Sequence, residues 1–124
     1  MAQVIIFLWV GDDLPPASDH SRVHHLHVRG IDAARQVVDS ISVDVVVSGH
    51  RLFDGNGVDL LEHVRKTQPF VARVLVTELS LAAAWSSNGL PAVDLVVAPS
   101  FVHRLVELVR RLLARQHTRA RVAG

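Results

Sequence analysis

Four neighbouring histidines are the side chains of this sequence whose type and spacing most directly suggest metal chemistry. They are His20, His24, His25 and His27. Alternate side chains of a strand point to the same face, so His25 and His27 could together bind Zn²⁺ through their imidazoles. The sequence contains no cysteine that could complete such a site. We therefore interpret the histidines as polar side chains of an exposed strand and expect no metal there.

Other catalytic patterns are missing from the sequence. Ser48, Ser80 and Ser100 have no accompanying pattern of histidine and acid that would build a hydrolase triad. The chain also lacks a P-loop and a dinucleotide-binding glycine pattern. We expect a protein that is not an enzyme.

The elements that position these residues follow from hydrophobic periodicity. Runs rich in apolar residues predict five strands: Val4–Val10, His24–Arg29, Val43–Ser48, Val71–Thr77 and Leu95–Val97. The run His24–Arg29 alternates polar and apolar residues, which is typical of an edge strand. Helical spacing and turn residues predict four helices: Ile31–Ile41, Val58–Thr67, Ser80–Ser87 and Phe101–Gln116, the last capped by Ser100.

Alternating strands and helices favour a parallel sheet covered on both faces. We predict an α/β, flavodoxin-like three-layer sandwich with a five-stranded parallel sheet in the order 2-1-3-4-5. Ligands of such sheets bind beyond the carboxyl ends of the strands. Here those ends are Gly11-Asp12-Asp13, Ser48-Gly49, Thr77 and Ala98-Pro99.

Composition is that of an ordinary globular domain. Of the 124 residues, 49% are hydrophobic and 20% are charged, and the formal net charge is +1. We expect one domain over residues 1–117 and a basic tail or linker over 118–124. The run Val4–Val10 is too short for a signal-peptide core or a membrane span. The lack of cysteine excludes disulfides, and we expect a cytoplasmic location.

The strongest single pattern begins at Gly49. The stretch from Gly49 to Leu61 reads Gly, His, Arg-Leu-Phe-Asp-Gly-Asn-Gly, then Val-Asp-Leu-Leu. It resembles the loop of response-regulator receiver (CheY-like) domains, whose pattern is an aspartate, any residue, Arg-Leu-Pro-Asp-Gly, a small polar residue, Gly and a helix start. The resemblance extends from Val4 to about Gln116 and implies the CheY-like version of the predicted fold.

The same comparison implies a degenerate phosphorylation pocket. Its positions are Gly11, Asp12, Asp13, Gly49, Arg51, Thr77, Leu95, Ala98 and Pro99. Gly49 takes the place of the aspartate that accepts a phosphoryl group, and Ala98 takes the place of a lysine. Gly11 stands at one of two acidic metal-ligand positions if the strand is aligned without a gap.

Three further positions complete the comparison. Leu95 replaces a switch aromatic, and Phe53 replaces the loop proline. Thr77 and the cis-like Pro99 are retained.

These departures favour a pseudo-receiver that signals without phosphorylation. We expect no cofactor, and no residual Mg²⁺ binding at Asp12 and Asp13. Two alternatives remain open. One is an unusual phosphate- and Mg²⁺-responsive site that uses Asp12, Asp13 or Asp54. The other is a small-ligand sensor that uses the emptied pocket at Gly49, Thr77 and Ala98.

A protein partner or a homodimer is the expected binding partner. The resemblance places the contact on the fourth helix, fifth strand and fifth helix. The candidate residues are Trp85, Leu95, Val97, Val102, Val106, Val109, Arg110 and Leu113. The last predicted helix carries two apolar stripes, more than docking on a sheet requires.

Two expectations concern the ends of the domain. The arginine-rich C-terminal end suggests a link to a fused output domain, and we expect neither nucleic-acid nor membrane binding. The family's first helix is predicted to be shortened or lost, because few residues separate Asp13 from His24. That would leave one face of the sheet exposed or covered by a partner.

Overall fold

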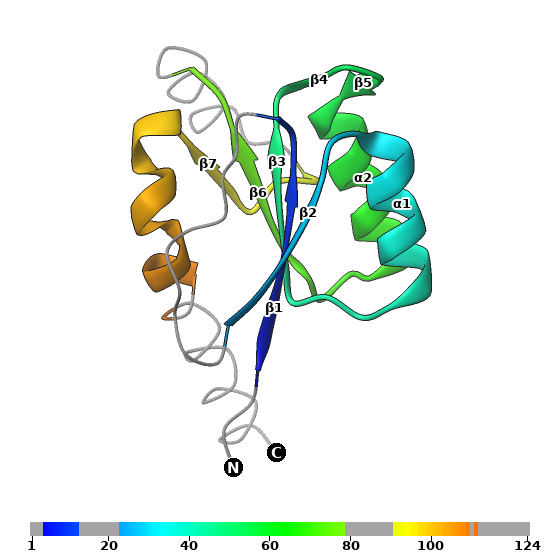
Figure 1. Ribbon diagram of the computed structural model, residues 1–124, viewed down its shortest axis with the longest axis horizontal. Helices are drawn as coiled ribbons and strands as arrows, with labels where there is room; N and C mark the ends of the chain where they lie inside the picture. The colour runs from blue at the N-terminus through cyan, green and yellow to red at the C-terminus, as the bar shows by residue number, and fades with distance from the viewer. Residues whose placement is uncertain (1–3, 13–22, 79–90, 110, 112–124) are drawn as a thin grey trace.

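The computed structural model describes residues 4–12, 23–78, 91–109 and 111. Within these ranges, five strands form one sheet in the order β2-β1-β3-β6-β7 (Figure 1). They are β1 (Ile5–Val10), β2 (Val23–Val28), β3 (Val45–Gly49), β6 (Ala72–Val76) and β7 (Leu95–Val97). All neighbouring pairs are parallel. The predicted fold class, the strand order 2-1-3-4-5 and the edge position of the histidine-rich strand are confirmed.

Helices cover both faces of the sheet, which gives three layers (Figure 1). Helices α1 (Ile31–Ser40) and α2 (Gly57–Thr67) lie on one face. A helix over residues 102–109 lies on the other face and follows the 3₁₀ turn η1 (Pro99–Phe101). A short hairpin, β4 (Arg51–Leu52) and β5 (Gly55–Asn56), connects β3 to α2.

Alternation of side chains along the strands divides the core into two clusters. Phe7 and Trp9 of β1 face the helix 102–109, whereas Leu8 and Val10 face α1 and α2. All four side chains are fully buried. A strand buried on both faces needs apolar residues at every position, which explains the continuous apolar runs of β1 and β3.

Three expectations are wrong in detail. Ser100 does not cap the last helix, because it lies inside the turn η1, whose N-cap is Ala98 with no side-chain hydrogen bond. Only one face of the helix 102–109 is fully buried, since Phe101 is exposed and Leu108 half-buried. The sheet face at β1 is not open, because Phe7 and Trp9 have no exposed surface.

Some predictions fall outside the described residues. These are the shortened first helix, the helix Ser80–Ser87 and the tail 118–124. None of the described helices combines the length and the apolar character that a membrane crossing requires.

We predict that Leu61→Ala lowers the free energy of unfolding by about 2–5 kcal/mol, because it leaves a cavity beneath α2 where Leu61 is fully buried. Urea unfolding followed by circular dichroism measures this loss. Phe70→Ala is the control: Phe70 is 95% exposed, and the change should stay within about 0.5 kcal/mol. Equal losses for the two variants would contradict the position of the core.

Candidate functional site

The carboxyl ends of the parallel strands bring the predicted pocket residues to one edge of the sheet. His50 N donates to Val76 O at 3.0 Å, and Thr77 N donates to Val97 O at 3.0 Å. These bonds extend the ladders β3–β6 and β6–β7 by one residue. The segments that contain Gly49, Thr77 and Ala98 are therefore neighbours, as the sequence predicts.

Gly49 occupies a position where a side chain would fit. A Cβ atom built there would lie 3.7 Å from Leu52 Cδ2 and 3.8 Å from Val10 O, which are ordinary van der Waals distances. The scaffold therefore does not require glycine at this position. The backbone leaves room for a Cβ atom at the position where the receiver resemblance implies an aspartate.

Gly57, at the start of α2, has no room for a side chain. A Cβ atom there would overlap Gly49 O and lie 2.7 Å from Ser48 Oγ. Gly57 N donates to His50 O at 2.8 Å, so the helix begins directly against the end of β3. This close approach needs glycine, and it keeps the geometry of the loop independent of the residue at position 49.

Thr77, Ala98 and Pro99 place no charged side chain at this edge of the sheet. Thr77 is buried, and its Oγ1 lies 3.4 Å from His50 Nδ1. Ala98 is half-buried and Pro99 is exposed. The Ala98–Pro99 bond is trans, which corrects the expectation of a cis-like proline.

The positions of two other predicted pocket residues indicate structural roles. Arg51 is exposed in the β4–β5 hairpin, and Leu95 packs half-buried against the core. Neither the hairpin arginine nor the strand leucine supplies a buried charge near Gly49.

Asp12 forms an exposed ion pair with an arginine. Arg29 Nε donates to Asp12 Oδ1 at 2.7 Å, and this hydrogen bond lowers the pKa of Asp12 and raises the pKa of Arg29. Asp13 lies outside the described residues. Within the described ranges, no group of three or more histidine, cysteine or acidic side chains could hold a metal ion.

The strand histidines form hydrogen bonds within the fold. Trp9 Nε1 donates to His25 Nδ1 at 2.9 Å, and His27 Nε2 donates to Gly11 O at 2.7 Å. His24 and His27 are exposed, as predicted, but His25 is half-buried against the rings of Phe7 and Trp9. The interpretation of His25 as an exposed polar residue is therefore wrong.

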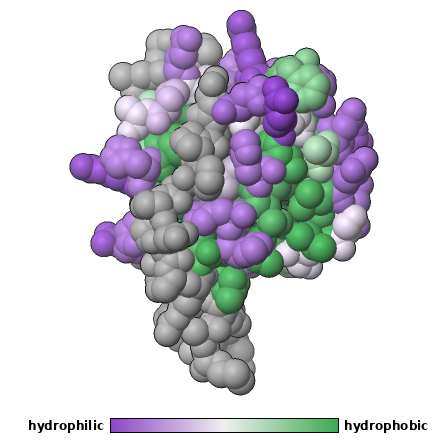
Figure 2. All heavy atoms as spheres, viewed as in Figure 1, coloured by the Kyte–Doolittle hydropathy of each residue, from purple (hydrophilic) through white to green (hydrophobic). Residues whose placement is uncertain are grey.

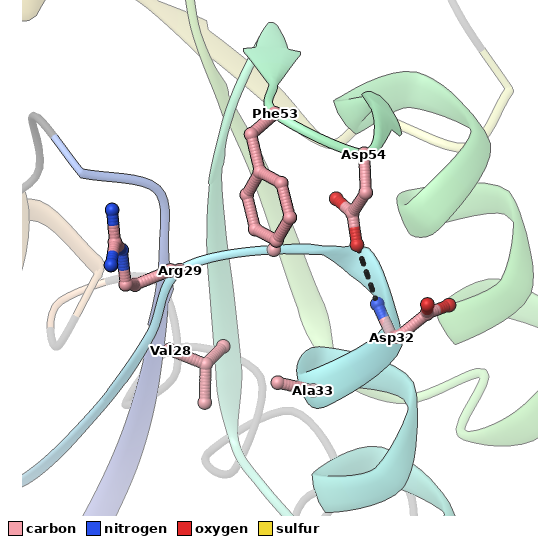
Figure 3. Close-up of a pocket in the computed structure, with 7 residues that line it drawn as sticks. Val28, Arg29, Asp32, Ala33, Phe53 and Asp54 are labelled. Carbon is pink, nitrogen blue, oxygen red and sulfur yellow. Dashed lines mark hydrogen bonds between the residues drawn. The ribbon is translucent and has the colours of Figure 1, made fainter.

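Asp54 has a role that sequence reasoning missed. Its Oδ1 accepts from Ile31 N at 2.8 Å, and its Oδ2 accepts from Asp32 N at 3.2 Å (Figure 3). These backbone hydrogen bonds, above all the one from Ile31, lower the pKa of Asp54. The carboxylate thus caps α1 from a distant loop and satisfies two N–H groups that the helix itself leaves without partners.

Gly30 makes this cap fit. Gly30 is the N-cap residue of α1 and has no side chain that could bond to the helix. A Cβ atom at Gly30 would overlap the ring of Phe53 and lie 2.7 Å from Asp54 Oδ1. Gly30 followed by a helical pattern without Ser, Thr, Asp or Asn at the cap was the signal in the sequence that another residue must cap α1.

Two cavities lie beside α1, and the sequence indicated neither. The first, of about 410 Å³, is shown in Figure 3 and is lined by Val28, Arg29, Gly30, Asp32, Ala33, Phe53 and Asp54. The second, of about 500 Å³, is lined by Leu26, His27, Val28, Ala33, Gln36, Val37, Ser40 and Ile41. Neither cavity includes Gly49, Thr77 or Ala98.

The predicted partner surface is largely core. Val97, Val102, Val106 and Val109 are at most 8% exposed and pack in the cluster between the sheet and the helix 102–109. They cannot contact a partner, because their side chains already contact the sheet. Trp85, Arg110 and Leu113 lie outside the described side chains.

Solved structures of receiver domains have the same architecture. The signal receiver domain of an HD domain-containing protein from Pseudomonas fluorescens Pf-5 is 20% identical, with a TM-score of 0.69, over 98% of this chain and 95% of that one. A signal receiver domain from Vibrio parahaemolyticus is 18% identical, with a TM-score of 0.72, over 98% of each chain. A response regulator receiver domain protein (CheY-like) from Methanospirillum hungatei JF-1 is 18% identical, with a TM-score of 0.64, over 94% of this chain and 99% of that one.

These matches show that the chain has the receiver fold. No protein-family model matches the sequence, and no curated protein matches it. The likeness is therefore one of structure, and the activity must be argued from the residues at the strand ends.

We predict that Asp54→Ala lowers the melting temperature by a few degrees, because it removes the cap of α1, whereas Asp54→Asn retains an acceptor oxygen and loses less. The folded-state pKa of Asp54 is lowered, so its stabilisation is present above the ordinary carboxyl pKa of about 3.9 and is lost as the pH falls through the folded-state value. Thermal unfolding at several pH values measures both effects. A difference between wild type and Asp54→Ala that persisted at the most acidic pH would contradict a cap formed by the charged carboxylate.

Proposed function

We propose that this chain is a receiver-like signalling module that takes up no phosphoryl group and acts through contact with another protein. The observation that carries the proposal is Gly49: the nucleophile position of the receiver fold is empty in a scaffold with room for a side chain. Tight packing did not force this loss. The catalytic carboxylate is missing while the loop that would hold it is intact.

Two further groups needed for phosphoryl transfer are also missing or occupied. Transfer to a carboxylate depends on positioning and on neutralising the charge of the phosphoryl oxygens. Ala98 provides no cation at the position of the lysine. Asp12 already pairs with Arg29 at 2.7 Å in an exposed ion pair, with which a metal ion would compete.

The contacts of Asp12 and Asp54 argue against a rebuilt site. Asp54 bonds to the first turn of α1, and Asp12 bonds to Arg29. A substitute phosphoacceptor or metal ligand would have to give up these bonds first. We therefore favour signalling by association over phosphate or metal sensing.

The module would act in the cytoplasm as part of a signalling chain. The absence of cysteine fits that compartment. The partner would be another protein, with an output domain fused to the chain as one form of it. The receiver fold supports this role, because it offers a rigid sheet whose loops and helix faces can be recognised without chemistry.

Beryllofluoride with millimolar Mg²⁺ tests the proposal, because it mimics a phosphoryl group on the aspartate of receivers. We expect the amide NMR signals of Gly49 and Thr77 to shift no more than with Mg²⁺ alone, because position 49 has no carboxylate to bind the mimic. A receiver domain that retains the aspartate serves as the positive control. Specific shifts at Thr77 in this chain would refute the proposal.

A Gly49→Asp variant checks the structural premise. Its melting temperature should stay within a few degrees of wild type, because a Cβ atom at this position meets only ordinary contacts. Gly57→Ala is the matched control and should destabilise the fold strongly, since its Cβ atom would overlap Gly49 O. Loss of folding in Gly49→Asp would show that glycine is required for packing.

A further inference from the structure

The two asparagines of this chain, Asn56 and Asn88, each precede a glycine. Such a bond is chemically labile, because the backbone nitrogen of a glycine is unhindered and can attack the side-chain carbonyl carbon of the asparagine. Asparagine accordingly counts among the thermolabile residues. Asn88 lies outside the described residues, whereas Asn56 ends the β4–β5 hairpin and is the N-cap of α2.

The reaction at an Asn-Gly bond has two steps. The glycine nitrogen forms a bond to Cγ of the asparagine and gives up its proton, and the side-chain nitrogen leaves as ammonia, which closes a cyclic imide (a succinimide). Water then opens the ring at either carbonyl, and the product is aspartate or isoaspartate. Nothing is oxidised or reduced, and the only co-reactants are water and base from the solvent.

Solvent reaches Asn56 in the folded chain. Asn56 is exposed, and so are the preceding residues Asp54 and Gly55. Figure 2 shows mostly hydrophilic side chains at the end of the molecule that carries the hairpin. Lack of access to water and base therefore does not protect this asparagine.

Hydrogen bonds hold both reacting groups in place. The nucleophile, Gly57 N, donates to His50 O at 2.8 Å. The side-chain amide that it would attack is also held, because Asn56 Oδ1 accepts from Val58 N at 2.8 Å. Gly57 is buried against the end of β3, where a Cβ atom would overlap Gly49 O. Ring closure therefore requires Gly57 to leave His50 and the amide of Asn56 to turn away from Val58.

The hairpin that carries Asn56 depends on a contact outside itself. Its ladder consists of two strands of two residues each, and a two-stranded hairpin is marginally stable on its own. Asp54 fastens it to α1 by accepting from Ile31 N at 2.8 Å and from Asp32 N at 3.2 Å. Local opening of a short exposed segment costs less free energy than unfolding of the whole domain. The bonds of Asp54 are therefore those whose loss should free Asn56.

We propose that Asn56 is a site of spontaneous conversion to aspartate and isoaspartate, and that the contact of Asp54 with α1 limits the rate of this conversion. Aspartate keeps an acceptor at the N-cap of α2 and adds a negative charge, which a helix N-terminus favours. Isoaspartate adds a carbon atom to the main chain, so Gly57 N and Val58 N lose their present partners. The reaction needs neither a protein partner nor a phosphoryl group, so this inference stands apart from the proposed function.

Mass spectrometry of tryptic peptides after incubation at mildly alkaline pH tests the site, with a sample at time zero to correct for reaction during digestion. Trypsin separates the two asparagines, because peptide 52–65 contains Asn56 and peptide 74–104 contains Asn88. In urea both peptides should gain the mass of deamidation at comparable rates, since both asparagines precede glycine. In buffer, peptide 52–65 should react at least about tenfold more slowly than in urea. No reaction of Asn56 in urea, or equal rates in urea and buffer, would overturn the proposal.

Variants test the role of the cap, each rate being divided by that of the same variant in urea. Asp54→Ala should speed the reaction of Asn56 at least about threefold, because the hairpin loses its bonds to α1. Val106→Ala is the control and should change the rate less than about twofold, because Val106 is fully buried on the other face of the sheet. Asn56→Ser keeps a capping oxygen and should abolish the mass gain of peptide 52–65. Equal acceleration by Asp54→Ala and Val106→Ala, or none by Asp54→Ala, would show that the cap does not control the site.

Discussion

The carboxylate of Asp54 connects the β4–β5 hairpin to the first turn of α1. Its bonds of 2.8 Å and 3.2 Å to the first N–H groups of α1 fix the β4–β5 hairpin above Gly30. Phe53, next to Asp54, lines the cavity beside α1, and a side chain at position 30 would displace the Phe53 ring and crowd the Asp54 carboxylate. A turn residue that the sequence explains by local conformation alone thus connects the loop after β3 to the helix after β2. Without it, the hairpin and α1 would have no described polar link.

At the strand ends, the residues that maintain the fold are not the residues that could do chemistry. Gly57 must be glycine, because α2 begins against the carbonyl of Gly49, whereas position 49 has room for a side chain. A Cβ atom at position 49 would make only ordinary van der Waals contacts with Leu52 and Val10. The residue at position 49 can therefore change with little effect on close packing. Under the proposed function, this difference would let the chain keep the receiver fold and the Asp-Gly-Asn-Gly turn without the nucleophile and the lysine.

The sheet could be predicted from the sequence because hydrophobic periodicity reports which faces of a strand are buried. β1 is apolar at every position and β3 begins with three valines, whereas β2 alternates, which placed the first two strands inside and the third at the edge. The cap by Asp54 could not be predicted, since its partners Ile31 and Asp32 are more than twenty residues away in sequence. Pairing of Asp12 with Arg29 is also a long-range contact. Local sequence patterns carry no information about such long-range contacts. The cavities beside α1 also depend on long-range packing and could not be predicted.

The helix 102–109 shows why apolar composition alone does not locate a binding surface. Its valines were predicted to meet a partner because they form a second stripe, yet Val102, Val106 and Val109 are the residues that fasten the helix to the sheet. A stripe reports that a face is apolar, and the fold decides whether the chain itself has covered it. Ile41 and Phe53 are single apolar residues in polar stretches, and both remain exposed. Phe53 lines the cavity of about 410 Å³ beside α1, and Ile41 lines the cavity of about 500 Å³. A contact surface of this chain is therefore better sought among apolar residues that the fold leaves exposed than among apolar stripes of the sequence.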